Sequence, residues 1–204
     1  MKKIAEKLNV IRNKNSVKLS NGINKELKDL EMANSEFNVE VKYLEKEFNK
    51  NGLNSVEFKI RTNIGEDMKS LAKVASGGEN SRIMLAIKTV LADVDKTETL
   101  VFDEIDTGIS GRAAQKVAEK MLIVAKKHQI LCITHLPQIA AMADYNFVIE
   151  KIVENYTAKT IILELSPDKV YNEIARLIGG TAITNVTVDA AKEMKILANK
   201  LKGE

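Results

Sequence analysis

Two adjacent carboxylates and a histidine, each at the end of a short apolar run, are the side chains best suited to chemistry in this sequence. Asp103 and Glu104 end "TLVFDE", and His135 ends "ILCITH". Short apolar runs bounded by polar residues predict strands that are covered on both faces. Because ligands of open parallel sheets bind beyond the carboxyl ends of the strands, we expect these three side chains to share one edge.

The carboxylate pair has two interpretations. Two carboxylates are costly to hold together in a dry core, so a counter-ion or solvent is expected beside them. The structural alternative is that one of them caps the following turn, "IDTGISG". The preceding apolar run favours a Walker B strand, in which Asp103 holds Mg²⁺, commonly through water, and Glu104 polarises the attacking water.

A glycine pair opens the helix that precedes these strands. In "SGGEN", Ser76 can cap the helix or act as a ligand hydroxyl, while Gly77 and Gly78 let backbone N–H groups approach an anion closely. The alternative is an ordinary glycine-containing helix start. The order of this segment, the carboxylate pair and His135 favours a phosphate site.

The remaining candidates for chemistry are less informative. A lone histidine at a strand end is more often structural, but the shared edge with the carboxylates makes His135 a phosphate-facing candidate. Cys132 lies inside the same strand and is most simply a small core residue. His128 ends a helix, and we assign it no role.

The elements that must position these residues are those of an α/β protein. Alternating apolar residues predict an antiparallel strand pair at residues 37–44 and 55–63. A helix is expected at 80–93, with a buried face formed by Ile83, Leu85, Ala86, Ile87, Val90 and Leu91. Two buried strands at 99–104 and 130–135, joined by a helix, form a parallel crossover unit. An antiparallel pair and two helices complete the chain.

Residues 3–36 have apolar residues at helical spacing: Ile4, Leu8, Ile11, Leu19, Ile23, Leu27 and Leu30. This pattern fits a surface helix packed on the domain. It also fits the base of a coiled-coil arm, although a coiled coil should sustain several heptads. The spacing alone leaves both interpretations open.

Composition indicates a soluble globular protein with room for a core. The 204 residues are 45% apolar and 29% charged, and a net charge of +3 is too balanced to predict a nucleic-acid footprint. One cysteine fits a reducing compartment. Without a membrane-length apolar run or a signal-peptide pattern, the sequence predicts a cytoplasmic protein without membrane contact.

Three stretches resemble the carboxyl-terminal part of the RecN family: "LAKVASGGENSRIMLAIKTVLADV", "TLVFDEIDTGISGRAAQKVAEKM" and "HQILCITHLPQIAAMADYNFVIEK". These are bacterial double-strand-break repair proteins of the SMC-like branch of ABC ATPases. The resemblance implies the carboxyl-terminal lobe of a P-loop NTPase head, with a mostly parallel sheet flanked by helices and a coiled-coil stub. The implied boundaries are 1–36 for the arm base and 37–204 for the lobe.

The resemblance also implies a role for each matching residue. The signature, which closes on nucleotide held by the opposite head, would be Ser76, Gly77, Gly78 and Glu79. The D-loop would contain Asp106, Thr107, Gly108 and Ser110. Glu104 and His135 would be the general base and the switch histidine, and Asp103 the Mg²⁺ ligand. Two departures are Asn80, where leucine or glutamine is more usual, and Ser110, where many ABC proteins have aspartate.

No G-x-x-x-x-G-K-[S/T] phosphate cradle occurs in the sequence. In the family that loop lies in the amino-terminal lobe, so we expect this chain to be inactive alone and to need that lobe as a partner. The resemblance implies that two complete heads sandwich ATP and Mg²⁺, and that their engagement acts on double-stranded DNA ends in repair and recombination. The bacterial nucleoid is the implied location.

Two other functions stay open. The lobe could be a non-enzymatic module for dimerisation or partner docking, with inherited motifs. It could also bind DNA directly through lysine-rich segments such as "EKLNVIRNKNSVK", although the small net charge argues against strong binding. Strands left without the missing lobe would expose apolar edges, so we expect self-association or reduced solubility.

Overall fold

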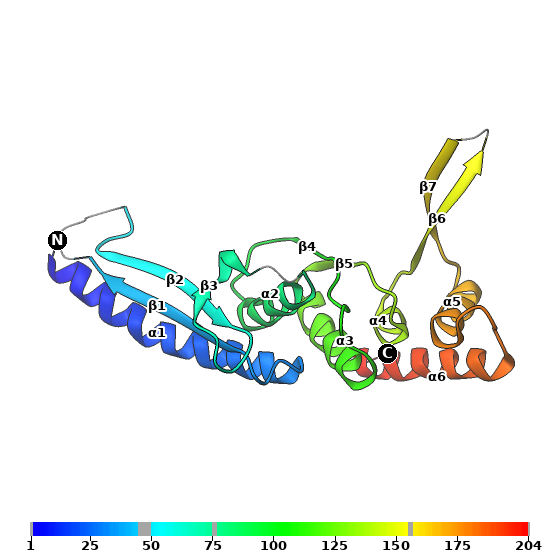
Figure 1. Cartoon of the computed structure of the whole chain (residues 1–204), viewed down its shortest axis with the longest axis horizontal. Helices are drawn as coiled ribbons and strands as arrows, with labels where there is room; N and C mark the ends of the chain where they lie inside the picture. Colours follow the sequence, from blue (N-terminus) through cyan, green and yellow to red (C-terminus); the bar gives the residue numbers. More distant parts are fainter. Residues whose placement is uncertain (1, 45–49, 75–76, 155–156, 204) are drawn as a thin grey trace.

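The computed structural model describes residues 2–44, 50–74, 77–154 and 157–203, which form an elongated molecule (Figure 1). The helices are α1 (Lys2–Asp29), η1 (Leu71–Lys73), α2 (Gly77–Leu91), α3 (Gly111–Ala125), α4 (Pro137–Met142), α5 (Pro167–Gly179) and α6 (Asn185–Lys202). The strands are β1 (Glu36–Tyr43), β2 (Asn54–Arg61), β3 (Lys69–Ser70), β4 (Thr99–Phe102), β5 (Gln129–Cys132), β6 (Phe147–Glu154) and β7 (Thr157–Glu164). Helix α6 runs back beneath α5 and α4 (Figure 1). The mixed α/β class is confirmed, and α2 begins three residues earlier than expected.

The described strands form three small sheets. Strands β1, β2 and β3 are antiparallel, β4 and β5 are parallel, and β6 and β7 are antiparallel. The expected mostly parallel sheet is therefore wrong. Parallel pairing needs a long crossover, and within the described sheets only β4 and β5 are joined through a helix, α3. The short links between β1 and β2 and between β6 and β7 lead to antiparallel pairs.

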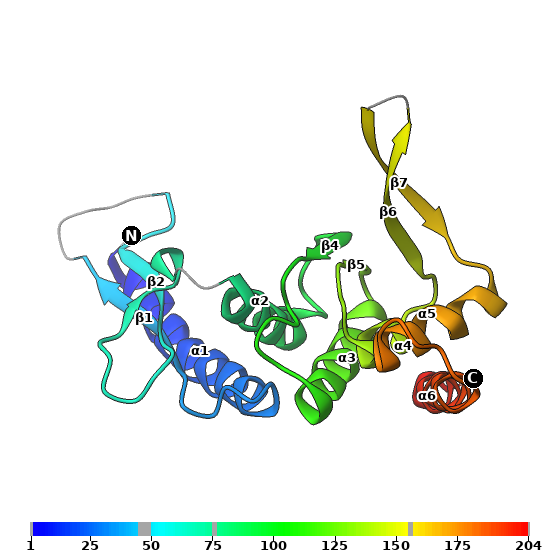
Figure 2. The same cartoon turned by 45° about the vertical axis from the view of Figure 1, so that its right-hand side comes forward.

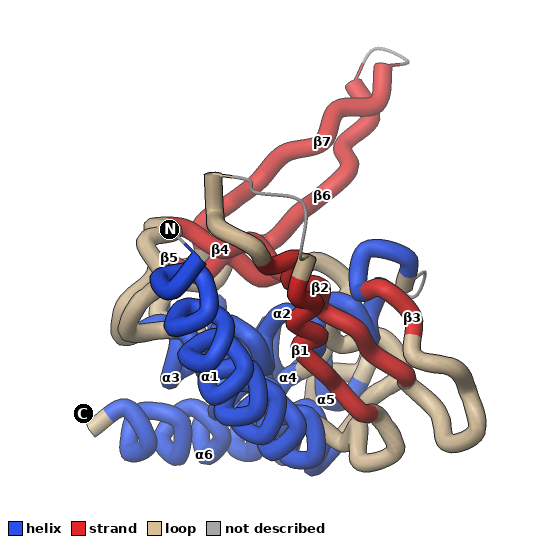
Figure 3. The backbone as a smooth tube through the Cα atoms, turned by 90° about the vertical axis from the view of Figure 1, so that its left-hand side faces the viewer, coloured by secondary structure: helices blue, strands red, loops and turns tan. Residues whose placement is uncertain are grey.

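Helix α1 packs along β1, as Figure 3 shows. Ile23, Leu27 and Leu30 are fully buried there. The Asn24 side chain replaces a neighbouring strand, because its amide group donates to Phe37 O at 2.8 Å and its oxygen accepts from Phe37 N at 2.7 Å. The second half of α1 is therefore part of the lobe's packing.

The first half of α1 is more exposed. Of the predicted apolar stripe, Ile4 and Ile11 are exposed and Leu8 is half-buried, so the early part of the stripe is not fully buried. A coiled-coil arm base over residues 1–36, and the boundary before residue 37, stay predictions.

The main core lies between α1, the β1–β2 pair, α2, α3 and one face of the β4–β5 pair. Of the predicted buried face of α2, Ile83, Leu85, Ala86 and Ile87 are buried, Leu91 is half-buried and Val90 is exposed. On β4, Leu100 and Phe102 are buried, but Val101 is 66% exposed. On β5, Leu131 is 49% exposed. The expectation that both faces of these strands are covered is wrong in this chain, since one face has a helical layer and the other does not.

The β6–β7 hairpin stands away from the helices (Figures 1 and 2). It exposes Phe147, Ile149, Val153 and Ile162. Beneath it, α4, α5 and α6 enclose a second, smaller apolar cluster. Helix α5 ends as predicted at a glycine pair, where Gly180 has φ 72°. None of the described helices has the length and apolar character needed to cross a membrane.

Candidate functional site at the carboxyl end of β4

The glycine pair that opens α2 lies against the loop that leaves β4. A Cβ atom on Gly77 would be 2.0 Å from Glu104 Oε2, where the carboxylate now lies. A Cβ atom on Gly78 would be 3.0 Å from both Glu104 O and Thr107 Cβ. Gly78 is therefore explained by close approach, because a Cβ atom there would press on the backbone of this loop, whereas at Gly77 only the Glu104 side chain would have to move.

Glu104 has a left-handed backbone, with φ 56°. For a residue other than glycine this conformation costs about 1 kcal/mol, and it persists only where surrounding contacts fix it. Such strain is common at functional sites. Asp103 and Glu104 are both exposed, so the carboxylate pair faces solvent rather than a dry core.

Side chains of α2 hold the same loop by its carbonyl groups. Ser81 Oγ donates to Asp103 O at 2.7 Å. Arg82 is buried, and its Nη1 donates to Ile105 O at 3.3 Å and to Thr107 O at 2.9 Å. Burial lowers the pKa of the Arg82 guanidinium, and the nearby charge of Glu79 partly offsets this. The first two turns of α2 thus fix the path of the loop at three carbonyl oxygens.

His135 is tied to this loop through Asp106. Asp106 is 3% exposed, and its Oδ2 accepts from Thr134 Oγ1 at 2.6 Å and from the backbone N–H of His135 at 2.8 Å. The ring nitrogen Nδ1 of His135 lies 3.0 Å from the same oxygen. The ends of β4 and β5 are joined by these contacts, so the helix start, the carboxylate pair and the histidine occupy one edge, as predicted.

The other predicted site residues lie in the first turn of α2, in the loop before α3 or outside the described residues. Ser76 lies outside the described residues. Glu79 lies in the first turn of α2 and is half-buried. Gly108, at φ 76°, and the exposed Ser110 lead into α3. These positions do not by themselves test the roles that the resemblance implies.

Cys132 and His128 have structural surroundings. Burial raises the pKa of the Cys132 thiol to about 12, which suits a core residue. The Nδ1 atom of His128 lies 2.5 Å from Thr97 O, and the residue is buried. Both observations agree with leaving these residues outside the site.

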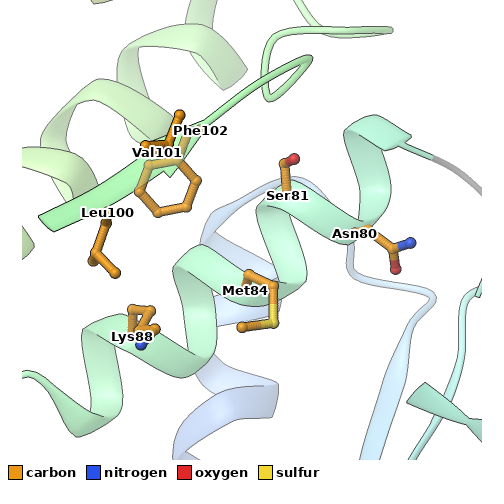
Figure 4. Close-up of a pocket in the computed structure, with 7 residues that line it drawn as sticks. All are labelled: Asn80, Ser81, Met84, Lys88, Leu100, Val101 and Phe102. Atoms are coloured by element: carbon orange, nitrogen blue, oxygen red, sulfur yellow. The ribbon is translucent and has the colours of Figure 1, made fainter. Parts of the chain in front are cut away.

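A pocket of about 220 Å³ lies between α2 and β4 (Figure 4). It is lined by Asn80, Ser81, Met84, Lys88, Leu100, Val101 and Phe102. Its volume is below the roughly 300–1,000 Å³ that is usual for small-molecule sites. The pocket is lined by residues of α2 on one side and by β4 on the other.

Mg²⁺ would fit this edge only with help from other ligands. Among the described residues, no three histidine, cysteine, aspartate or glutamate side chains gather as a metal cage. Mg²⁺ commonly keeps several waters and takes one or two carboxylates together with phosphate oxygens. The exposed Asp103 at the end of β4 fits that kind of site.

Sequence reasoning missed three residues that build this edge: Ser81, Arg82 and Thr134. It also placed Asp106 only in the D-loop and not beside His135. A signal for Arg82 was present, because a cation four positions after Gly78 falls on the apolar face of α2, where a buried charge needs partners.

Known proteins with similar sequences are RecN DNA repair proteins. The chain is 44% identical to that of Halalkalibacterium halodurans, over 94% of this chain and 34% of that protein. It is 41% identical to that of Bacillus subtilis, over 97% and 37%, and 37% identical to that of Haemophilus influenzae, over 95% and 35%. This chain is a homologue of the RecN proteins. It spans about a third of the length of these curated relatives.

The fold is similar to that of a solved SMC head domain. The crystal structure of the Smc head domain with a coiled coil and joint, from Pyrococcus yayanosii, covers 80% of this chain with a TM-score of 0.53. This chain covers 29% of that one at 19% identity, so the likeness concerns the fold alone. No protein-family model matches the chain.

Proposed function

We propose that this chain is the carboxyl-terminal lobe of a RecN-like ATPase head that acts in double-strand-break repair. The observation that carries the proposal is the contact of Gly77 and Gly78 with the loop from Glu104 to Thr107. This contact brings the start of α2 beside Glu104, and the separate contact of His135 Nδ1 with Asp106 supports a shared edge for the imidazole. Phosphoryl transfer needs these groups mainly for positioning and charge neutralisation.

Each group has a distinct role in this proposal. Glu104 orients and deprotonates the attacking water, and His135 faces the γ-phosphate of the same nucleotide. The start of α2, from Ser76 to Glu79, binds the nucleotide of a second head through backbone N–H groups. Asp106, Thr107, Gly108 and Ser110 form the D-loop between the two sites. Asp103 would hold Mg²⁺, which would supply positive charge to neutralise the phosphates.

The proposal requires a second lobe, because the sequence contains no phosphate cradle. The uncovered face of β4 and β5 offers a surface for that lobe, with Val101 and Leu131 exposed. The two strands also form a sheet of only two, whose edges can accept further strands. The relatives are about three times longer than the matched segment, which leaves ample length for such a lobe.

A chimera tests the proposal. This chain would replace the matching segment of the Halalkalibacterium halodurans RecN protein, and Mg²⁺-dependent ATP hydrolysis would be compared with that of this chain alone and of the unaltered relative. We expect turnover in the chimera and none in the chain alone. A folded chimera that neither binds nor hydrolyses ATP would reject the proposal, as would turnover by this chain alone that Glu104→Gln abolishes.

A non-enzymatic docking module is the second candidate, and the exposed apolar face of β4–β5 favours it. In that case the chimera would assemble but Glu104→Gln would leave its properties unchanged. Direct DNA binding by this chain is a third possibility. A salt-dependent mobility shift of double-stranded DNA at micromolar concentrations of this chain would support it.

A further inference from the structure

The most buried carboxylate at the edge of the sheet is Asp106, not either member of the exposed pair. Asp106 is 3% exposed, whereas Asp103 and Glu104 face solvent. A buried carboxylate is expensive unless donors surround it. Its Oδ2 has three of them, all from the end of β5: Thr134 Oγ1, the backbone N–H of His135 and the Nδ1 edge of the His135 ring.

Arg82 holds the backbone on either side of Asp106. The guanidinium of Arg82 donates to the carbonyl oxygens of Ile105 and Thr107, the two residues that flank Asp106. Thr134 adds a second constraint, because its Oγ1 also accepts from the backbone N–H of Leu136. The carboxylate therefore cannot turn outward without breaking its hydrogen bonds to Thr134 and His135.

We propose that Asp106 is a positioning residue that selects the ring orientation and the Nδ1–H tautomer of His135. The tautomer of a histidine is set by the hydrogen bond that its other nitrogen makes. With Nδ1–H donating to Asp106, the proton of the neutral ring is on the inner nitrogen and Nε2 has its lone pair toward the exposed side. The His135 side chain is 71% exposed, so a ligand can reach this atom.

The consequence for chemistry is specific. In the neutral ring, Nε2 accepts a hydrogen bond or a proton; in the protonated ring, both nitrogens donate, and Nε2–H can bind an anionic oxygen. A ring without Asp106 would rotate freely and would present either nitrogen. This inference rests on the proposed function for its role at a phosphate, but the pairing of Asp106 with His135 can be tested without nucleotide.

The test is nitrogen NMR of this 204-residue chain labelled at its histidines, above the pH at which the rings lose their second proton. The sequence has two histidines, so His128 provides an internal reference whose Nδ1 lies against Thr97 O. We expect His135 to be mainly the Nδ1–H tautomer in the unaltered chain. In Asp106→Asn the neutral acceptor is weaker, so this tautomer should become the minor form while the His128 signals do not move.

Thr134→Val is the matched control. It removes another donor to the same Asp106 oxygen without touching the ring, so it should lower stability and leave the His135 tautomer unchanged. The unaltered chain showing mainly Nε2–H would overturn the inference, as would a folded Asp106→Asn variant with the original tautomer. If Asp106→Asn does not fold, the His135 tautomer in the unaltered chain and in Thr134→Val still tests the inference. The ATPase of the chimera does not enter these outcomes, so the two proposals can fail separately.

Discussion

The loop after β4 and the β6–β7 hairpin both leave the body of the molecule, but the chain fixes them to very different degrees. The loop receives hydrogen bonds from α2 and from the segment after β5, and it contains the buried carboxylate of Asp106. The hairpin pairs only with itself among the described strands and exposes apolar side chains. The loop is held by contacts from within this chain. A two-stranded hairpin is only marginally stable unless other elements pack against it. In the proposed head, the loop after β4 therefore has its supporting contacts within this chain, and the β6–β7 hairpin does not.

The largest expected effect concerns the loop after β4. In the chimera, Glu104→Gln should lower the rate of ATP hydrolysis about a hundredfold or more, since a general base contributes at least that factor. ATP binding should be retained, because the amide is isosteric with the carboxylate. Steady-state hydrolysis and nucleotide binding measure the two effects. Normal turnover in Glu104→Gln would remove Glu104 as the base.

The glycine pair predicts a difference between two similar substitutions. Gly78→Ala would press a methyl group against the backbone oxygens of Glu104 and Thr107, so it should lower the free energy of unfolding by about 2 kcal/mol. Gly77→Ala meets only the mobile end of the Glu104 side chain and should cost less. Urea unfolding of both variants measures this. Equal losses would contradict the described contact between α2 and the loop.

In the β6–β7 hairpin, substitutions are expected to change self-association more than stability. Ile149 and Ile162 are cross-strand partners and both are exposed, so replacing both with threonine should change the free energy of unfolding by less than about 0.5 kcal/mol. The same change should reduce concentration-dependent self-association, measured by sedimentation velocity. Buried Ile60→Thr is the control and should be strongly destabilising. Association that persists unchanged in the double variant would show that the hairpin is not its cause.

The smallest expected effect is a dependence of the free energy of unfolding on pH. Hydrogen bonds from Lys88 and from Thr97 lower the pKa of the Asp95 carboxyl. Lysine hydrogen bonds also lower the pKa values of Asp29, Glu40 and Glu119. A lowered folded-state pKa contributes stability above the unfolded-state value, near 4, and this contribution is lost as the pH falls through the folded-state value.

Thermal unfolding between neutral and acidic pH measures this dependence. The midpoint should fall on acidification, and Asp95→Asn should flatten the curve slightly. Lys88→Met should flatten it in the same way, because it removes the main donor to Asp95. A steeper curve in either variant would contradict the assignment.

Much of the fold could be predicted from local patterns. Strand alternation gave β1 with β2, and the two apolar runs around a helix gave the parallel pair β4–β5. The wrong expectation of a mostly parallel sheet came from the resemblance to the RecN family, whereas the local patterns predicted the two antiparallel pairs that the structure shows. The uncovered face of β4 could not be predicted, since an apolar run looks the same whether or not its cover lies in the chain.

The candidate site was predictable to a similar extent. Residue order indicated that the glycine pair, the carboxylates and His135 share an edge. The partners of Asp106 and Arg82 were not predictable, because they lie in segments far apart in the sequence. Roles at a nucleotide stay predictions for all these residues.

One measurement tests most directly whether this edge forms one nucleotide site. Amide hydrogen exchange of the chimera would be compared with and without Mg²⁺ and a non-hydrolysable ATP analogue. We predict that protection rises together at residues 77–82, 103–107 and 134–136, while the β6–β7 hairpin changes less. Protection confined to one of the three segments, or absent although nucleotide binds, would contradict a common site.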